Sequence, residues 1–312
     1  ANASKHSAMS HEHLEKQMTL AQDQIQELLA KAADADSTPL QDGLSIPEEI
    51  KRREDRLAKF KEAKKVMEQR AKQRFEEEKA EHEAKLAQRQ AKEASTGRKS
   101  RGREPKPPQE GPRDKDQYNF TDPESQIMKD GGSFEQCFNA QAAVEVETML
   151  VVGQHVSNAP NDKQQLEPTL NAVSPAVGPV SGVLADSGYY SERAVATVEN
   201  GGEGPTVYAA MKRHSHGRSV QQLEKHPDPP APPEGASAAE IMAHRLETKA
   251  GKDLYGLRKQ TVEPVFGIIK EVLGFRRFLL RGLDNVSLEW TLVSTSYNLK
   301  RLFNLGMRVK TD

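Results

Sequence analysis

The sequence has little cysteine and no long hydrophobic run. Its single cysteine, Cys137, excludes an intramolecular disulfide and a zinc site of clustered cysteines, and it indicates a reducing cytoplasm. No stretch of about 18 apolar residues and no secretory signal is present, so we expect a soluble chain without a membrane partner. Only 35% of the 312 residues are hydrophobic, which predicts a compact core with polar appendages rather than one uniform core.

An excess of charge of one sign is also missing. The 45 Lys and Arg residues balance 46 Asp and Glu residues, so the net charge indicates no partner and any charge argument must be local. Neither a phosphate-binding glycine loop nor a dinucleotide fingerprint occurs, which leaves a nucleotide-cofactor enzyme without support. The histidines show no spacing typical of metal ligands, and Cys137 is interpreted as a small buried residue rather than a nucleophile.

Three regions of different composition follow one another. Residues 1–94 are predicted to form a helical hairpin, with apolar positions spaced by three and four residues and Pro47 placed to open the second helix. Residues 95–117 are rich in glycine, proline and basic residues and are predicted to be a linker. Residues 118–312 are predicted to form the core, with a proline-rich loop insertion at 212–237.

The core region alternates short strand patterns with helix patterns. Residues 138–146 alternate in polarity and residues 149–156 can return as a partner strand, so we expect a β-hairpin. Residues 161–162 are expected to cap the next helix, and buried strands are expected at 180–185 and 206–210. Further helices are expected at 191–200, 238–246 and 253–273 and from about residue 284 onward. This order predicts an α/β layer architecture.

Asp186 and Glu263 are the candidate site residues. Asp186 directly follows a predicted strand, and open α/β sheets bind ligands at the carboxyl ends of their strands. Glu263 precedes Pro264, which is expected to start or kink a helix, and shares a helical face with Lys270. Two such carboxylates are suitable ligands for magnesium. The alternatives are that Asp186 only caps a turn and that Glu263 is an ordinary surface carboxylate.

The C-terminal part has a local excess of positive charge. Residues 251–312 contain 11 Lys and Arg residues against 6 Asp and Glu residues. Four of these cations follow Glu263 closely: Lys270, Arg276, Arg277 and Arg281. They are suited to neutralise DNA phosphates, although a solvated helix end would have the same composition. Residues 97–103 form a second basic patch, which either contacts DNA or is a charged linker.

Three motifs together resemble bacterial insertion-sequence transposases of the DDE type. They are Ala-Asp-Ser-Gly-Tyr-Tyr at 185–190, Val-Glu-Pro-Val-Phe-Gly-Ile-Ile-Lys at 262–270 and Phe-Leu-Leu-Arg-Gly-Leu at 278–283. The resemblance covers nearly the whole chain. It implies a ribonuclease H-like mixed sheet with flanking helices, interrupted by the α-helical hairpin. It also implies metal-dependent DNA strand cleavage and strand transfer by a homo-oligomer on double-stranded DNA in the bacterial cytoplasm, associated with the nucleoid.

The same resemblance assigns roles to the two carboxylates. In that family three acidic residues hold two divalent ions, Mg²⁺ or Mn²⁺, and Asp186 matches the second and Glu263 the third. The first Asp has no match and is expected on a strand before Ala1, so we expect an N-terminally truncated fragment that is inactive by itself. Asp122 is a poor substitute, because Asp-Pro is a turn signal and no strand leads into it.

The family's Tyr, Arg, Glu, Lys signature matches Tyr255, Arg258, Glu263 and Lys270. The resemblance implies that Tyr255 and Arg258 bind DNA together with Lys270, Arg276, Arg277 and Arg281. Four residues separate Arg258 from Glu263, where related groups usually have three, so Arg258 is the less secure match. We expect the carboxylates of Asp186 and Glu263 to face one cleft within about 8 Å, a reach set by two metal ions. The alternative from a different class is a non-catalytic DNA-binding or helical interaction protein, a decayed transposase remnant.

Overall fold

The structure, a computed structural model, describes residues 1–35, 45–100, 102–130, 132–211, 227–233 and 235–306. The chain divides into two compact units, one of residues Ser4–Pro123 and the other of residues Ala1–Ala3 with Glu124–Asp312. Most of the predicted loop insertion at 212–237 lies outside the described residues. Within the described residues, no helix is both long and apolar enough to cross a bilayer.

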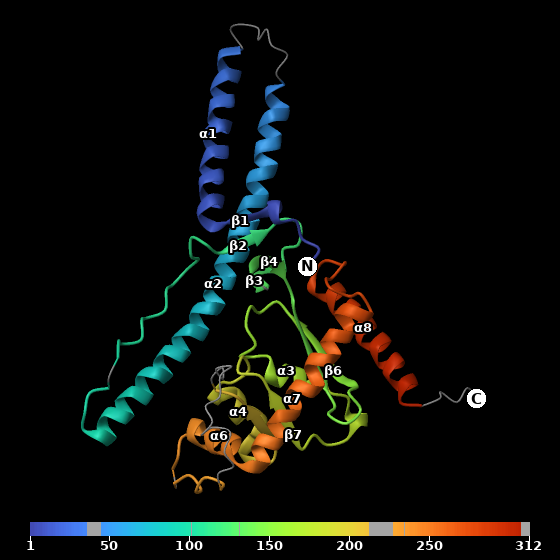
Figure 1. Cartoon of the computed structure of the whole chain (residues 1–312). Helices are drawn as coiled ribbons and strands as arrows, with labels where there is room; N and C mark the ends of the chain where they lie inside the picture. The colour runs from blue at the N-terminus through green and yellow to red at the C-terminus, as the bar shows by residue number, and fades with distance from the viewer. Residues whose placement is uncertain (36–44, 101, 131, 212–226, 234, 307–312) are drawn as a thin grey trace. The chain divides into compact units, whose positions relative to one another are not determined.

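The unit Ser4–Pro123 is built on the predicted helical hairpin. Helix α1 (His11–Ala35) and helix α2 (Ile46–Thr96) run antiparallel (Figure 1). A proline and two glutamates lie in the first turn of α2, where the helix dipole favours them, and Gly97 ends the helix with a positive φ of 62°. The apolar stripes of the two helices meet in a buried cluster of Leu14, Phe60, Ala63, Met67 and Tyr118.

A short strand pair forms the base of this hairpin. Strand β1 (Ala8–Ser10), which follows a single 3-10 turn (Lys5–Ser7), pairs antiparallel with β2 (Gln117–Asn119), and Met9 lies opposite Tyr118. The sequence analysis did not predict this pair, because three-residue strands carry too little periodicity to be recognised. The pair brings the chain before α1 and the chain after the linker to the same place.

The predicted linker packs along α2. The Arg89 guanidinium donates hydrogen bonds to the carbonyl oxygens of Ser100, Gly102 and Arg103 at 3.2–3.3 Å. Nearer the base, Arg113 pairs with Glu78 and Arg74 pairs with Asp116, both at 2.8 Å. Because side chains of α2 satisfy its main-chain carbonyls, this polar segment is held against the helix without a hydrophobic core.

The second unit contains the α/β part, and its α/β class agrees with the prediction. Its strands are β3 (Gln126–Asp130), β4 (Ser133–Cys137), β5 (Asn139–Val144), β6 (Val151–Ser157), β7 (Gly182–Ala185) and β8 (Thr206–Ala209). Its helices are α3 (Leu166–Asn171), α4 (Glu192–Glu199), α6 (Ala238–Glu247), α7 (Lys249–Gly267) and α8 (Leu283–Asn304), with 3-10 turns at Pro175–Val177 and Asn200–Gly202 and a π-turn at Ile268–Val272.

The strands of this unit pair two by two. Strands β3 and β4 form one antiparallel hairpin, and β5 and β6 form the antiparallel hairpin that the sequence predicted. Strands β7 and β8 are parallel, with Ala185 opposite Ala209. Over the described residues these pairs are separate two-stranded sheets, so the single mixed sheet stays a prediction.

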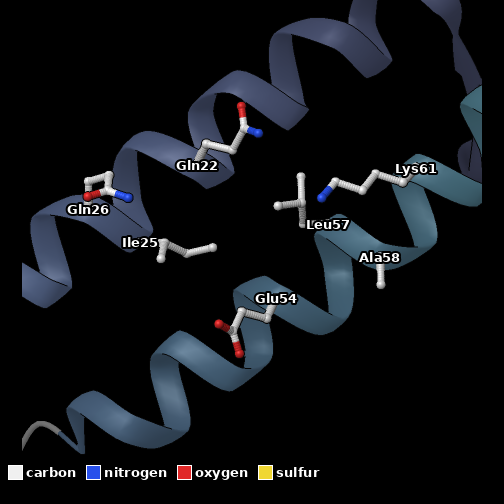
Figure 2. Close-up of a pocket in the computed structure, with 7 residues that line it drawn as sticks. All are labelled: Gln22, Ile25, Gln26, Glu54, Leu57, Ala58 and Lys61. Atoms are coloured by element: carbon white, nitrogen blue, oxygen red, sulfur yellow. The ribbon is translucent and has the colours of Figure 1, made fainter.

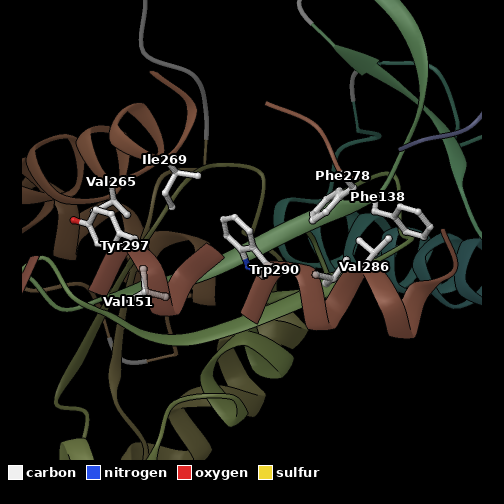
Figure 3. Close-up of a cluster of buried hydrophobic side chains, with 9 residues drawn as sticks. Phe138, Val151, Val265, Ile269, Phe278, Val286, Trp290 and Tyr297 are labelled. Carbon is white, nitrogen blue, oxygen red and sulfur yellow. The ribbon is translucent and has the colours of Figure 1, made fainter. Parts of the chain in front are cut away.

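Helices α7 and α8 bury an aromatic cluster against the β5–β6 hairpin (Figure 3). Trp290 is 2% exposed, stacks on Phe266 with ring centroids 5.8 Å apart, and donates from its indole nitrogen to the Gln141 carbonyl at 2.9 Å. The buried members are Phe138, Val151, Val156, Val265, Ile269, Phe278, Val286, Trp290 and Tyr297. This cluster fixes one face of α7 against the hairpin.

A second apolar cluster surrounds β7 and β8. Its buried members are Leu166, Ala185, Val195, Val207, Ala209 and Met242, which come from the two strands and from α3, α4 and α6. The Ser191 hydroxyl accepts a hydrogen bond from the Ala194 amide at 3.1 Å, which confirms the predicted cap of α4. Of the four residues of β7 only Ala185 is buried, so the cluster packs around the carboxyl end of the strand, and the predicted burial of the whole segment 180–185 is not observed.

Two local predictions are wrong. Pro264 does not start a helix, because α7 begins at Lys249 and continues past it before the π-turn. The helix tolerates Pro264 because one backbone bond is lost while Val265 and Ile269 stay buried on the core side. The expected cap at residues 161–162 does not form either, since α3 begins only at Leu166 and the Asp162 carboxylate accepts hydrogen bonds from β5 instead.

Candidate active site

Asp186 lies at the carboxyl end of β7, as the sequence predicts. The strand ends at the buried Ala185, and the chain then turns, with the Tyr189 amide donating to the Asp186 carbonyl at 3.1 Å. One carboxylate oxygen, Oδ1, accepts from the Ser187 amide at 2.6 Å. Asp186 therefore does stabilise the turn, but its side chain is 59% exposed and its other oxygen points to a different partner.

That partner is Arg258 of α7, which also faces Glu263. The Nη1 atom of Arg258 lies 3.8 Å from Asp186 Oδ2, and its Nη2 atom lies 3.8 Å from Glu263 Oε1. These distances are ion-pair contacts rather than direct hydrogen bonds. The strand end and the helix thus bring two carboxylates to one cation. The five-residue step from Arg258 to Glu263 does not prevent this arrangement.

The burial of Arg258 contrasts with that of its partners. Its side chain is 16% exposed, whereas Asp186 and Glu263 are 59% and 61% exposed. The guanidinium carbon lies 5.7 Å from the centre of the Tyr255 ring, one turn earlier on α7, which is within cation–π range. Burial raises the pKa of Tyr255, and the nearby Arg258 opposes that rise. The cation is therefore held in place while the carboxylates remain open to a ligand.

The four other predicted cations are exposed. Lys270 lies on the π-turn, where each residue turns the chain by less than in an α-helix, so it shares the face of Glu263 less fully than expected. Arg276 pairs with Glu271, and Arg281 donates to the Asn2 carbonyl at 2.8 Å. In the described ranges Lys270, Arg276, Arg277 and Arg281 form no ion pair with Asp186 or Glu263, so their role in DNA binding stays a prediction.

The chemical type of the two carboxylates is suited to binding a divalent metal ion. Asp186 and Glu263 offer hard oxygen ligands, and their exposure leaves room for water or phosphate oxygens in addition. Over the part of the chain that the structure describes, no group of three or more His, Cys, Asp or Glu side chains could hold a metal ion. Asp186 and Glu263 are therefore described by their contacts with Arg258 alone.

Asp122 does not alter this view. It lies in the unit Ser4–Pro123, is 1% exposed, and its amide donates to the Asn119 side chain at 3.1 Å in a tight turn. The turn agrees with the Asp-Pro signal in the sequence.

Sequence reasoning missed a polar network next to Asp186. The Asp162 Oδ1 atom accepts hydrogen bonds from Asn139 Nδ2 and Gln141 Nε2, both at 2.8 Å. Gln141 in turn accepts a hydrogen bond from the Tyr189 hydroxyl. Burial raises the pKa of Tyr189 well above its ordinary range, and Asp162 and Asp186 raise it further. Two amide side chains on one face of a predicted core strand were the signal that could have revealed this network.

A crevice between α1 and α2 is a weaker candidate (Figure 2). It has a volume of about 370 Å³ and is lined by Gln22, Ile25, Gln26, Glu54, Leu57, Ala58 and Lys61. Its lining mixes aliphatic and amide side chains with one carboxylate and one ammonium group, so it offers neither a metal-ligand set nor a nucleophile and base.

Comparison with known families identifies the family of the chain. A family model described as transposase DDE domain matches residues 108–299, more than half of the chain, and the match includes Asp186, Arg258 and Glu263. Searches of curated proteins and of solved structures give no match. Because this match covers more than half of the sequence, the chain belongs to the DDE transposase family.

Proposed function

We propose that Asp186 and Glu263 are catalytic carboxylates for DNA strand cleavage and strand transfer during transposition of an insertion sequence. The observation that carries the proposal is the ion-pair contact of both carboxylates with Arg258, at 3.8 Å each. It explains why a strand end and a helix about 75 residues apart in sequence converge. The alternative of a non-catalytic remnant has no observation in its favour.

Asp186 and Glu263 would hold Mg²⁺ or Mn²⁺, and two such ions supply an activated water and stabilisation of the leaving oxygen of a phosphodiester. Arg258 keeps the two carboxylates close together and offsets their mutual repulsion. The Tyr255 ring contacts the guanidinium of Arg258 at cation–π distance. The chemistry needs positioning and charge neutralisation more than a protein nucleophile.

The remaining parts of the proposal concern DNA and assembly. Lys270, Arg276, Arg277 and Arg281 are exposed cations suited to bind phosphates of the element ends and of the target. We further propose a ribonuclease H-like arrangement, in which β5 and β7 belong to one sheet, because α7 packs on both strands. Action as a homo-oligomer on DNA in the cytoplasm completes the proposal.

The test combines metal binding and nicking. We expect the 312-residue chain to bind Mn²⁺ weakly, and Asp186→Asn or Glu263→Gln to remove that binding in a calorimetric titration. Either substitution should also abolish Mn²⁺-dependent nicking of duplex DNA. Glu167→Gln, which changes an exposed carboxylate on α3, is the matched control. Full nicking by either site variant would refute the proposal.

A further inference from the structure

The polar network beside Asp186 has no part in the proposed chemistry as stated so far. Its four side chains come from three segments: Asn139 and Gln141 from β5, Asp162 from the loop before α3, and Tyr189 from the loop after β7. Gln141 is 3% exposed, and its backbone carbonyl is also bound by the Trp290 indole at 2.9 Å. The network is therefore anchored to the aromatic cluster on one side and to the loop of Asp186 on the other.

Asp162 contacts the Asp186 loop at a second point. A Cβ atom placed on Gly188 would lie 3.1 Å from Asp162 Oδ2, so the carboxylate packs closely against the main chain of Gly188. One residue later, Tyr189 is linked to Asp162 through Gln141. The Tyr189 amide also donates to the Asp186 carbonyl at 3.1 Å. The loop is thus held both directly and indirectly from Asp162.

We propose that Asp162 is a positioning residue that fixes the direction in which Asp186 faces Arg258 and Glu263. This inference rests on the proposed function, because it gives the loop geometry a catalytic consequence. Asp162 acts through Gln141 and Gly188 and does not act as a metal ligand. Its Oδ1 atom already accepts two amide hydrogen bonds, and its Oδ2 atom packs against the main chain of Gly188.

Two substitutions of Asp162 distinguish a positioning role from a metal-ligand role. The carbonyl oxygen of an asparagine has two lone pairs, so Asp162→Asn can keep both hydrogen bonds to Oδ1 while it removes the charge. Asp162→Ala removes both bonds and the contact with Gly188. A positioning role therefore predicts that asparagine rescues what alanine loses, whereas a metal-ligand role predicts that both variants fail.

The experiment measures hydrogen exchange and Mn²⁺ binding in the full 312-residue chain. In Asp162→Ala we expect amide exchange in the loop 186–190 to rise about tenfold, while exchange in α8 stays unchanged. Mn²⁺ affinity, titrated with the metal alone, should fall about 10- to 100-fold, as expected for a residue that orients a ligand. Asp162→Asn should stay within about threefold of the wild type in both measurements.

A second variant reaches the same linkage from the loop and remains informative if Asp162→Ala does not fold. Tyr189→Phe removes the hydroxyl that binds Gln141 and should raise loop exchange about fivefold. Tyr297→Phe is its matched control, because it removes a hydroxyl bond of the same kind to the Met149 carbonyl at 2.9 Å in the aromatic cluster. Tyr297→Phe should not change amide exchange in the loop 186–190.

The outcomes separate the two proposals. Unchanged loop exchange in Asp162→Ala, or in Tyr189→Phe where the alanine variant does not fold, would overturn the positioning role. If the alanine and asparagine variants lose Mn²⁺ binding equally and amide exchange in the loop does not change, the positioning role is also overturned, and Asp162 is a metal ligand instead. If the wild type binds no Mn²⁺ but the loop loosens in Asp162→Ala, the metal site of the proposed function fails while loop positioning by Asp162 is supported.

Discussion

Helix α7 has an apolar face and a charged face, and the two faces make different kinds of interaction. One face buries Val265 in the aromatic cluster and is continued by Ile269 of the following π-turn, at 0% and 1% exposure. The other presents Arg258 to Asp186 and Glu263, which are more than half exposed. Apolar packing fixes the helix through many interchangeable contacts, whereas the charged face depends on the distances between a few named atoms. Substitutions should therefore affect stability on the first face and chemistry on the second.

The sharpest test of this difference is on the charged face. In a chain with a complete set of ligands, Asp186→Asn or Glu263→Gln should reduce Mg²⁺-dependent nicking by at least about a thousandfold, because metal-assisted charge stabilisation is worth several kcal/mol. The free energy of unfolding should change by less than about 0.5 kcal/mol, since both side chains are exposed. A large loss of stability in urea denaturation would show that this face is structural.

The corresponding test on the apolar face is Trp290→Ala on α8, because this ring stacks on Phe266 of α7. This side chain is 2% exposed and touches Phe266, Phe275 and Phe278. Its removal should lower the free energy of unfolding by about 3–5 kcal/mol in urea denaturation. Leu292→Ala on the same helix, where the side chain is 68% exposed, should cost less than about 0.5 kcal/mol. Similar losses in the two variants would contradict the assigned burial.

A smaller effect is expected at the exposed cations. Lys270→Gln and Arg276→Gln should each weaken DNA binding across sequences and reduce the slope of log affinity against log salt by about 1. Lys16→Gln on α1, where the side chain is 67% exposed, serves as the control. Binding measured by fluorescence anisotropy at several salt concentrations gives the slope, and an unchanged slope would assign these cations to the solvated surface.

The smallest expected effect concerns pH. Burial raises the pKa of Tyr189 above its ordinary value of 10.0 in the folded state. The stability that Tyr189 contributes is therefore fully present below about pH 10 and is lost as pH rises toward the folded-state pKa. Tyr189→Phe should reduce the decline in unfolding free energy between about pH 8 and about pH 11. An equally steep decline in the variant would show that Tyr189 is not the titrating group.

Periodicity predicted the elements of the fold well where packing follows the chain locally. The hairpin of α1 and α2, the pair β5–β6 and the cap Ser191 all follow from spacing and from the preference of serine for helix starts. The β3–β4 hairpin escaped prediction because its strands carry little apolar alternation.

The site could be predicted in part. The strand-end position of Asp186 and the helical position of Glu263 were recognisable from the sequence, and the match to Arg258 came from the resemblance. Asp162 was misinterpreted, because an aspartate before a helix is ordinarily a cap. Only the three-dimensional position of Gln141 shows that the Asp162 carboxylate accepts a hydrogen bond from this side chain instead. Local sequence rules cannot resolve such a choice between a near and a distant hydrogen-bond donor.

The β1–β2 pair has a consequence for how this protein can change over time. Ser10 lies opposite Gln117 in this pair. The segment between them, which contains α1, α2 and the returning segment, therefore begins and ends at the same place. Turns can be added to or deleted from both helices at the far end without moving that point. The returning segment contacts the later part of α2, at Arg74, Glu78 and Arg89, so it is not affected by a change at that end. The hairpin is thus free to vary in length among descendants while its attachment stays constant.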